Sequence, residues 1–403
     1  MIRLVALSFA HGKTLSIFSL DRSHGRNGSL MNALFSYGFR PFFLLASLSA
    51  ASFVGTWVGR LFYPKLFSLG QVDVAWHAHE MLFGFTMAMV AGFLLTAVPN
   101  WTNTEPHKGR ALVILAGLWL LGRISMVMPR SLAASIVDLA FVPTLLLFLV
   151  PPLWKRFAGK TFVFVPILGG LWAGNLLYHL EMLGLSTSGG MANLFTLTGI
   201  QLLIVIIGGR VIPFFTLKRL SSSPQRWTVV EVVSVLTILT LPFLEFFPVW
   251  VLWLWTLSVG TSHCLRAWGW YHRGVWSEPL LWVLYLGYAW IPVGGVLMGL
   301  AHLGHGHVSA GLHALTSGAI GTVGIGIMAR ASLGHTGRPL RAPALAVASF
   351  VLVLTASALR VLGPLSSLEP RLYLVGSGAA WSLGFLLFFV AYLPILTGPR
   401  ADA

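Results

Sequence analysis

The sequence has few charged residues and a single cysteine. Asp, Glu, Lys and Arg together make up 9% of its 403 residues, whereas soluble proteins carry roughly 25%. So few charges cannot cover a surface that faces water, which excludes a soluble enzyme, a coiled coil and a disordered chain. Cys264 alone cannot form a disulfide framework or an iron–sulfur cluster. Apolar residues make up 56% and the mean hydropathy is +0.82, which indicates a polytopic protein of the lipid bilayer.

Several signatures of known chemistry are also absent. The sequence has no phosphate-binding P-loop, no HExxH, no GxSxG and no CxxCH haem-attachment motif. Any haem would therefore be bound non-covalently. Lys and Arg outnumber Asp and Glu by 26 to 11, but they lie between apolar stretches instead of forming one basic face. This pattern indicates membrane topology, and we expect no nucleic-acid partner.

Apolar stretches of about 20 residues, the length that a bilayer core requires, follow one another from residue 40. Their backbone amides must find partners within the same segment, so the stretches are predicted to be helices. The predicted fold is an all-α, polytopic transmembrane helix bundle in one domain, residues 34–398, preceded by a flexible cytoplasmic tail, residues 1–33. The twelve predicted spans are 40–61, 77–99, 110–128, 132–153, 161–183, 190–215, 228–246, 248–268, 279–302, 309–331, 342–363 and 371–396.

The distribution of basic residues predicts the orientation. With the N-terminus inside, the inner segments hold 20 of the Lys and Arg residues and the outer loops hold 6. This asymmetry places both termini in the cytoplasm. The second, sixth and tenth spans end in similar segments, LLTAVPNW at 94–101, IIGGRVIPFF at 206–215 and IGIMARASLG at 325–334. An arrangement of three four-helix units is one interpretation of that regularity.

Histidines gather on the predicted outer side. Seven of the 13 lie in the outer third of the membrane or in the outer loops, although that side is poor in Lys and Arg. Imidazole is the commonest metal ligand among side chains, and ionisable residues at membrane depth are candidates for function. The seven are His77, His79, His179, His302, His305, His307 and His313.

The segment WHAHEM at 76–81 places two of them at the start of the second span. On an α-helix His77 and His79 point about 200° apart, whereas His77, Glu80 and Met81 share a face. One imidazole is then a candidate axial ligand, while the other faces a second site or solvent. Glu80 is a candidate to orient a ligand imidazole or to carry protons. The alternative is that both histidines only form hydrogen bonds with loops.

A second group lies at the end of the ninth span. AHLGHGH at 301–307 spaces His302, His305 and His307 around glycines, a pattern suited to copper or zinc. The alternative is a flexible histidine-rich loop. His179 lies at a matching depth and is a candidate to complete either site.

Three charged residues near the membrane need partners or a function. Arg210 and Arg330 follow glycine-rich stretches at inner helix ends. They are candidates for clamping an anionic group, or they extend to the inner interface. Asp138 in the fourth span either belongs to a proton relay or is paired with a neighbouring helix.

Five blocks of the sequence occur in a characteristic order. They are LFSYGFRPFFLLA at 34–46, WHAHEMLFGF at 76–85 with GFLLTAVPNWT at 92–102, GGRVIPFFT at 208–216, EPLLWVLYLGYAWIP at 278–292 and HALTSGAIGTVGIGIMARASLGHTGRPL at 313–340. Together they resemble the NnrS family of bacterial inner-membrane proteins, from residue 34 to the C-terminus. The blocks include His77, His79, Glu80, Arg210, His313, Arg330 and His335. The resemblance implies twelve spans, haem (heme) and copper, and a role linked to nitric oxide in denitrification or nitrosative stress. Because a CxxCH motif is absent, the haem is expected to be non-covalent and b-type.

The layout is also similar to the large subunit of haem–copper oxidases, in which histidines on the second and tenth spans hold a haem. Here His77 or His79 and His313 occupy such positions. The sixth and seventh spans hold no histidine, which argues against a complete oxidase.

The hypothesis from the sequence is a membrane haem protein, with copper as a second metal, that binds or transforms nitric oxide. The reaction and the electron donor are left open. The alternative is a secondary transporter or metal permease without haem, but such proteins usually carry polar residues near the midplane in two similar halves.

Overall fold

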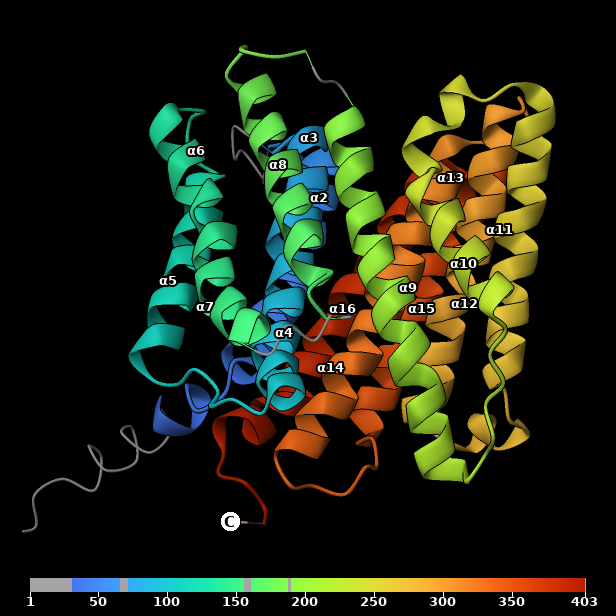
Figure 1. The fold of residues 1–403 in the computed structure, drawn as a ribbon. Coiled ribbons are helices and arrows are strands. Elements are labelled where there is room, and N and C mark those ends of the chain that lie inside the picture. The colour runs from blue at the N-terminus through green and yellow to red at the C-terminus, as the bar shows by residue number, and fades with distance from the viewer. Residues whose placement is uncertain (1–30, 66–71, 156–160, 188–189, 403) are drawn as a thin grey trace, which may run out of the picture.

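The computed structural model describes residues 31–65, 72–155, 161–187 and 190–402. Within these ranges the chain forms helices and no strand (Figure 1). The all-α prediction is therefore confirmed. Residues 1–30 of the predicted tail lie outside the described residues.

All twelve predicted spans coincide with helical segments. The second, fourth, seventh and tenth spans are each built from more than one element, because a π-helical turn, a 3₁₀ turn or a short break lies within them. The elements are α2 (Phe39–Phe62), α3 (Val74–His79), η1 (Glu80–Thr86), α4 (Met87–Thr102), α5 (Arg110–Ser125), α6 (Leu132–Leu139), α7 (Phe141–Lys155), α8 (Phe164–Met182), α9 (Met191–Leu220), α10 (Thr228–Leu239), η2 (Leu241–Phe246), α11 (Val249–Trp270), η3 (Arg273–Ser277), α12 (Pro279–His302), α13 (Val308–His313), η4 (Ala314–Gly321), α14 (Thr322–His335), α15 (Ala344–Leu362), η5 (Gly363–Leu365) and α16 (Pro370–Thr397).

Eight helical runs of the described chain are long and apolar enough to cross a membrane. The other four predicted spans correspond to α5, α8, α10 with η2, and α11. Of these, α5 has 16 residues and α10 has 12, which is short for a bilayer core. Helices α8 and α11 are longer, but they carry polar residues or many tryptophans. The molecule is a polytopic helix bundle, while the count of twelve spans stays a prediction.

Side chains at the helix starts explain several boundaries. Asp73 caps α3, because its Oδ1 accepts a hydrogen bond from the Trp76 amide at 2.8 Å. Ser131 caps α6 in the same way through the Ala134 amide. Pro279 and Pro370 occupy the first position of α12 and α16, where no amide proton is needed.

The packing brings the two ends of the chain together. Helix α16 contacts both α15 and α2, so the first and last described spans lie side by side (Figure 1). Helix α12 packs closely against α14 and α11. A Cβ atom on Gly287 would lie 2.7 Å from the Val323 amide nitrogen, and one on Gly299 would lie 2.0 Å from Thr256 Oγ1. Glycine at these positions allows the helices to approach as membrane helices do.

Two helical runs contain a π-helical segment directly after a histidine. Segment η1 follows His79 at the end of α3, and η4 follows His313 at the end of α13. Helices α3 and α13 lie at the same end of the bundle, opposite to the C-terminus (Figure 1). Turns of π-helix are rare in proteins, and those that occur are often found at functional sites. Both positions are therefore candidates for a site.

Candidate functional site

A cluster of buried polar side chains joins four helical runs near the end of the bundle where α3 begins. Its members come from α3 and η1, α5, α6 and α8, and all are at most 7% exposed. They are His79, Glu80, Arg123, Asp138, Asn175 and His179.

Asp138 is the centre of the cluster. Its Oδ1 accepts a hydrogen bond from Arg123 Nη2. Its Oδ2 accepts from Asn175 Nδ2 at 2.8 Å and from His179 Nε2 at 2.9 Å, and it lies 3.2 Å from His79 Nε2. A buried carboxylate needs such partners, because it has lost its contact with water.

The partners of His79 are all acceptors. Nδ1 lies 3.0 Å from Glu80 Oε1, and Nε2 lies 2.9 Å from Asn175 Oδ1. The Asn175 amide is fixed in this orientation because its NH₂ group donates to Asp138. Both ring nitrogens of His79 must therefore donate, so the hydrogen bonds describe a protonated imidazolium ring.

The cluster is balanced in charge. Arg123 Nη1 donates to Glu80 Oε1 at 2.6 Å, so this guanidinium group bridges both carboxylates. The two carboxylates of Glu80 and Asp138 are matched by the charges of Arg123 and of protonated His79. Buried charges persist in a protein when they are paired and hydrogen-bonded in this way.

Two glycines make room for the charged groups. A Cβ atom on Gly84 would lie 3.0 Å from Arg123 Nη1, and one on Gly122 would lie 3.0 Å from Asp138 Oδ1. Gly84 is part of η1, and its carbonyl accepts a hydrogen bond from Trp119 Nε1 at 3.1 Å. Gly84 thus lets α5 approach the second span, and Gly122 lets α5 and α6 approach each other.

Three members of the cluster form a potential metal site. Ligand atoms of His79, Asp138 and His179 lie within 4.8 Å of one another. This is the only set of three such ligands found in the described part of the chain. Two imidazoles and one carboxylate suit copper, zinc or iron. A metal ion there would replace the proton on His79 Nε2, because a ligand nitrogen must be deprotonated.

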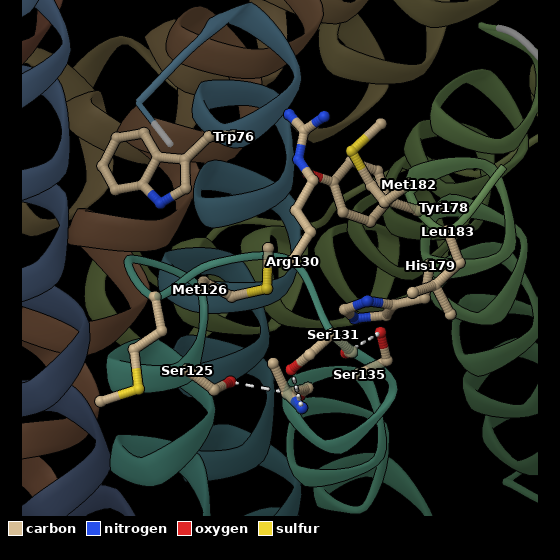
Figure 2. Close-up of a pocket in the computed structure, with 12 residues that line it drawn as sticks. Trp76, Ser125, Met126, Arg130, Ser131, Ser135, Tyr178, His179, Met182 and Leu183 are labelled. Carbon is tan, nitrogen blue, oxygen red and sulfur yellow. Dashed lines mark hydrogen bonds between the residues drawn. The ribbon is translucent and has the colours of Figure 1, made fainter. Parts of the chain in front are cut away.

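A small pocket adjoins His179 (Figure 2). Its volume of about 30 Å³ is enough for roughly one water molecule. Met126, Met128 and Met182 are among the residues that line it. Arg130, another lining residue, forms an ion pair with Asp73 at 2.6 Å.

A second histidine pair lies on the other side of the second span. His77 stacks on Trp57, with ring centroids 5.4 Å apart, and its buried Nδ1 has no partner among the described residues. His313 donates from Nδ1 to the Ser309 carbonyl at 2.8 Å. His77, His313 and Arg360 are close enough to interact electrostatically. Arg360 donates to Ser309 Oγ at 3.2 Å.

The predicted site residues therefore separate into two groups. His77 and His79 point to different sites, as their angular separation predicted. His313 approaches His77, while His179 joins His79. Glu80 was predicted to share a face with His77; in the structure its carboxylate contacts His79, and η1 begins at Glu80.

The histidines at 302–307 are not brought together as a three-ligand site in the described chain. His302 contacts the Met298 carbonyl through Nδ1 at 2.8 Å, and His305 and His307 are exposed. Arg330 is buried, with its guanidinium carbon 3.8 Å from the centre of the Phe215 ring. Arg210 lines a cavity in another part of the bundle.

Arg123 and Asn175 were missed by reasoning from the sequence. A signal for Arg123 existed, since it is a charged residue inside the apolar stretch 110–128. Asn175 gave no comparable signal, because a single uncharged amide side chain in a membrane helix does not indicate one particular function.

The fold and this buried site define an all-helical polytopic membrane protein with a potential metal centre. The chain belongs to the NnrS family: the family model described as "NnrS protein" matches residues 33–400. No curated protein matches the chain. Membership of this family fits a membrane protein connected with nitric oxide.

Proposed function

We propose that this protein is a bacterial inner-membrane haem protein, with copper as a second metal, that binds or transforms nitric oxide in denitrification or nitrosative-stress defence. The observation that carries the proposal is the pair His77 and His313, which interact electrostatically and lie in two helical runs that both contain a π-helical segment.

The ring nitrogens of the pair support non-covalent haem. The Nδ1–H of His313 is held by the Ser309 carbonyl, which leaves Nε2 with its lone pair free to bind iron. The orphaned Nδ1 of His77 is a buried polar atom that has no protein partner in the described chain. His77 and His313 would hold a b-type haem, which would supply a one-electron centre when bound.

Arg360 supports the same assignment through its charge. It is half-buried beside the two imidazoles, and no carboxylate of the described residues lies within 4.0 Å of it. A haem propionate is the kind of anion that a guanidinium group binds through a charge-assisted hydrogen bond.

The cluster around Asp138 fits a copper site. The carboxylates of Glu80 and Asp138 carry two negative charges, and Arg123 carries one positive charge. The proton on His79 supplies the second positive charge. A copper(I) ion carries that same unit charge. The thioethers of Met126, Met128 and Met182 near His179 are soft ligands, which favour copper(I) over harder ions.

Nitric oxide suits an apolar bundle of this kind. It is a small neutral gas that dissolves in hydrocarbon, so it needs no polar channel through the protein. The larger apolar cluster of the described chain includes residues from Phe39 to Leu396. The excess of Lys and Arg in the predicted inner segments favours cytoplasmic termini in the inner membrane.

Absorption spectra of the detergent-purified protein, oxidised and reduced, test the haem assignment. We expect a Soret band and sharp bands after reduction in the wild type, and loss of both in His77→Ala and His313→Ala. His302→Ala is the matched control, because His302 is half-buried and also contacts a carbonyl four residues earlier. A wild type that stays colourless after expression with added haem would contradict the proposal and favour a transporter or metal permease.

A further inference from the structure

A second cavity lies between α9, α10 and α11, away from the histidine sites. Its volume is about 390 Å³. Arg210 on α9, Arg226 in the connection to α10, and Arg266 on α11 line it, together with Glu231 at the start of α10. Arg210 and Arg266 lie in the halves of α9 and α11 that run toward the C-terminal end of the bundle (Figure 1).

Basic side chains predominate among the charged residues that line this cavity, with three arginines and one glutamate. Arg266 is buried and is paired with Glu231, with Nη2 2.5 Å from Oε2. Arg266 Nη1 also donates to the Val205 carbonyl and the Tyr288 hydroxyl. Arg226 donates from Nη2 to the Gly209 carbonyl, which is a neutral acceptor.

An anion that enters a cavity lined by several guanidinium groups can accept hydrogen bonds from more than one of them. Arginine is suited to this role, because its planar fork of donors matches the oxygens of a phosphate group. The cavity thus combines a fixed positive site with room for a group of phosphate size.

Apolar side chains of α10 also line the cavity. Val232 and Leu236 lie one turn apart on α10, and each is 51% exposed. In a membrane such exposed apolar side chains face the acyl chains of lipids. A ligand that contacts both kinds of side chain has an anionic head and a hydrocarbon tail, which is the chemistry of an anionic phospholipid and not of a free anion.

We propose that this cavity binds the phosphate headgroup of an anionic phospholipid from the leaflet at the C-terminal end of the bundle. Arg210 and Arg226 bind the phosphate oxygens, and Arg266, held by Glu231, fixes the inner wall. The acyl chains lie along Val232 and Leu236. This site is separate from the haem and copper sites, so it does not depend on the proposed function.

Native mass spectrometry of the full-length, detergent-purified protein tests the proposal. Phosphatidylglycerol and phosphatidylcholine are titrated against the wild type, Arg210→Gln/Arg226→Gln and Arg273→Gln. Arg273 is exposed in η3 and does not line the cavity, so its variant is the matched control. We expect preferential binding of phosphatidylglycerol, weakened about fivefold for each arginine removed from the cavity and unchanged in the control.

A single variant serves if the double variant fails to fold, and inorganic phosphate serves as a second ligand that distinguishes a lipid from a soluble anion. If the double variant does not fold, Arg226→Gln alone is used, because Arg226 lies outside the helices and should show the fivefold loss. Equal affinity for the two lipids, or the same loss in Arg273→Gln, would overturn the proposal. Inorganic phosphate is added at the same concentration. Thermal protection by phosphate equal to that by phosphatidylglycerol would identify a soluble anion as the ligand and overturn the lipid assignment.

Discussion

Asp138 connects side chains that come from three other segments of the chain. Its negative charge compensates the positive charges among them. Arg123 and His179 donate to it, and His79 lies beside it. Removing the charge of such a residue leaves its partners buried without compensation, which costs far more than removing an exposed ion pair.

Asp138→Asn is therefore expected to destabilise the protein by about 3–5 kcal/mol. The matched control is Asp73→Asn. It removes the exposed ion pair with Arg130 but keeps an oxygen that can cap α3, so it should cost no more than about 1 kcal/mol. Unfolding of both variants in mixed micelles, followed by circular dichroism, measures the difference. Equal stability of the two variants would show that the buried network is not what holds these helices together.

The hydrogen bonds of His79 lead to a prediction about pH. If copper(I) replaces one proton on this ring, protons compete with the metal, and the affinity falls as the pH falls. The expected change is about tenfold per pH unit for one displaced proton. Competition with a chromophoric copper(I) chelator at pH 6, 7 and 8 measures it, with His179→Ala as a variant that loses a ligand. An affinity that does not change with pH would contradict the protonated state of His79.

Reasoning from the sequence identified His79, Glu80, Asp138 and His179 as single candidates but did not assemble them. The first and last are 100 positions apart in the sequence, and spacing predicts neighbours only within one helix. Which helices lie side by side is decided by packing, for instance by Gly84 and Gly122, whose lack of a side chain admits Arg123 and Asp138. No local pattern in the sequence reports that contact.

At the scale of the elements, the positions of the helices along the sequence were predictable. The direction in which individual side chains point from those helices was less predictable. Apolar stretches of bilayer length located every helical run, because a lipid environment leaves the backbone few other choices. The π-helical segments at Glu80–Thr86 and Ala314–Gly321 were not predicted. Their residues give no distinct signal in the sequence, so the second span departs from the predicted α-helix from Glu80 onward.

The close approach of α12 and α14 can be tested at one glycine. Gly287→Ala places a Cβ atom 2.7 Å from the backbone nitrogen of Val323, so the helices must separate. We expect a loss of about 1–3 kcal/mol in stability. Gly117→Ala in α5 is the control, because nothing lies within 4 Å of the added atom. It should be neutral or stabilise the helix by up to about 1 kcal/mol. The same micelle unfolding assay compares them, and equal effects would contradict tight packing at Gly287.

For the whole molecule, the main feature is the difference between its two ends. The histidine pair and the Asp138 cluster lie toward the end where α3 and α13 begin, and the C-terminus lies at the other (Figure 1). The cavity lined by Arg210, Arg226 and Arg266 is separate from the histidine pair and the Asp138 cluster. The sequence predicted the histidine-rich end correctly, because successive helices alternate in direction and their ends can be assigned by counting. It did not predict the cavity, whose lining residues come from three separate segments.

The orientation of these ends in the membrane is testable by cysteine labelling. Cys264, which is exposed, is first replaced by serine. His305→Cys and Ala401→Cys then place one thiol at each end, both at exposed positions. Because basic residues concentrate in the predicted inner segments, a maleimide that cannot cross membranes should label position 305 in intact cells. Position 401 should react only after the cells are permeabilised. The reverse pattern would place the histidine sites on the cytoplasmic side, and nitric oxide would then be met there and not at the periplasmic face.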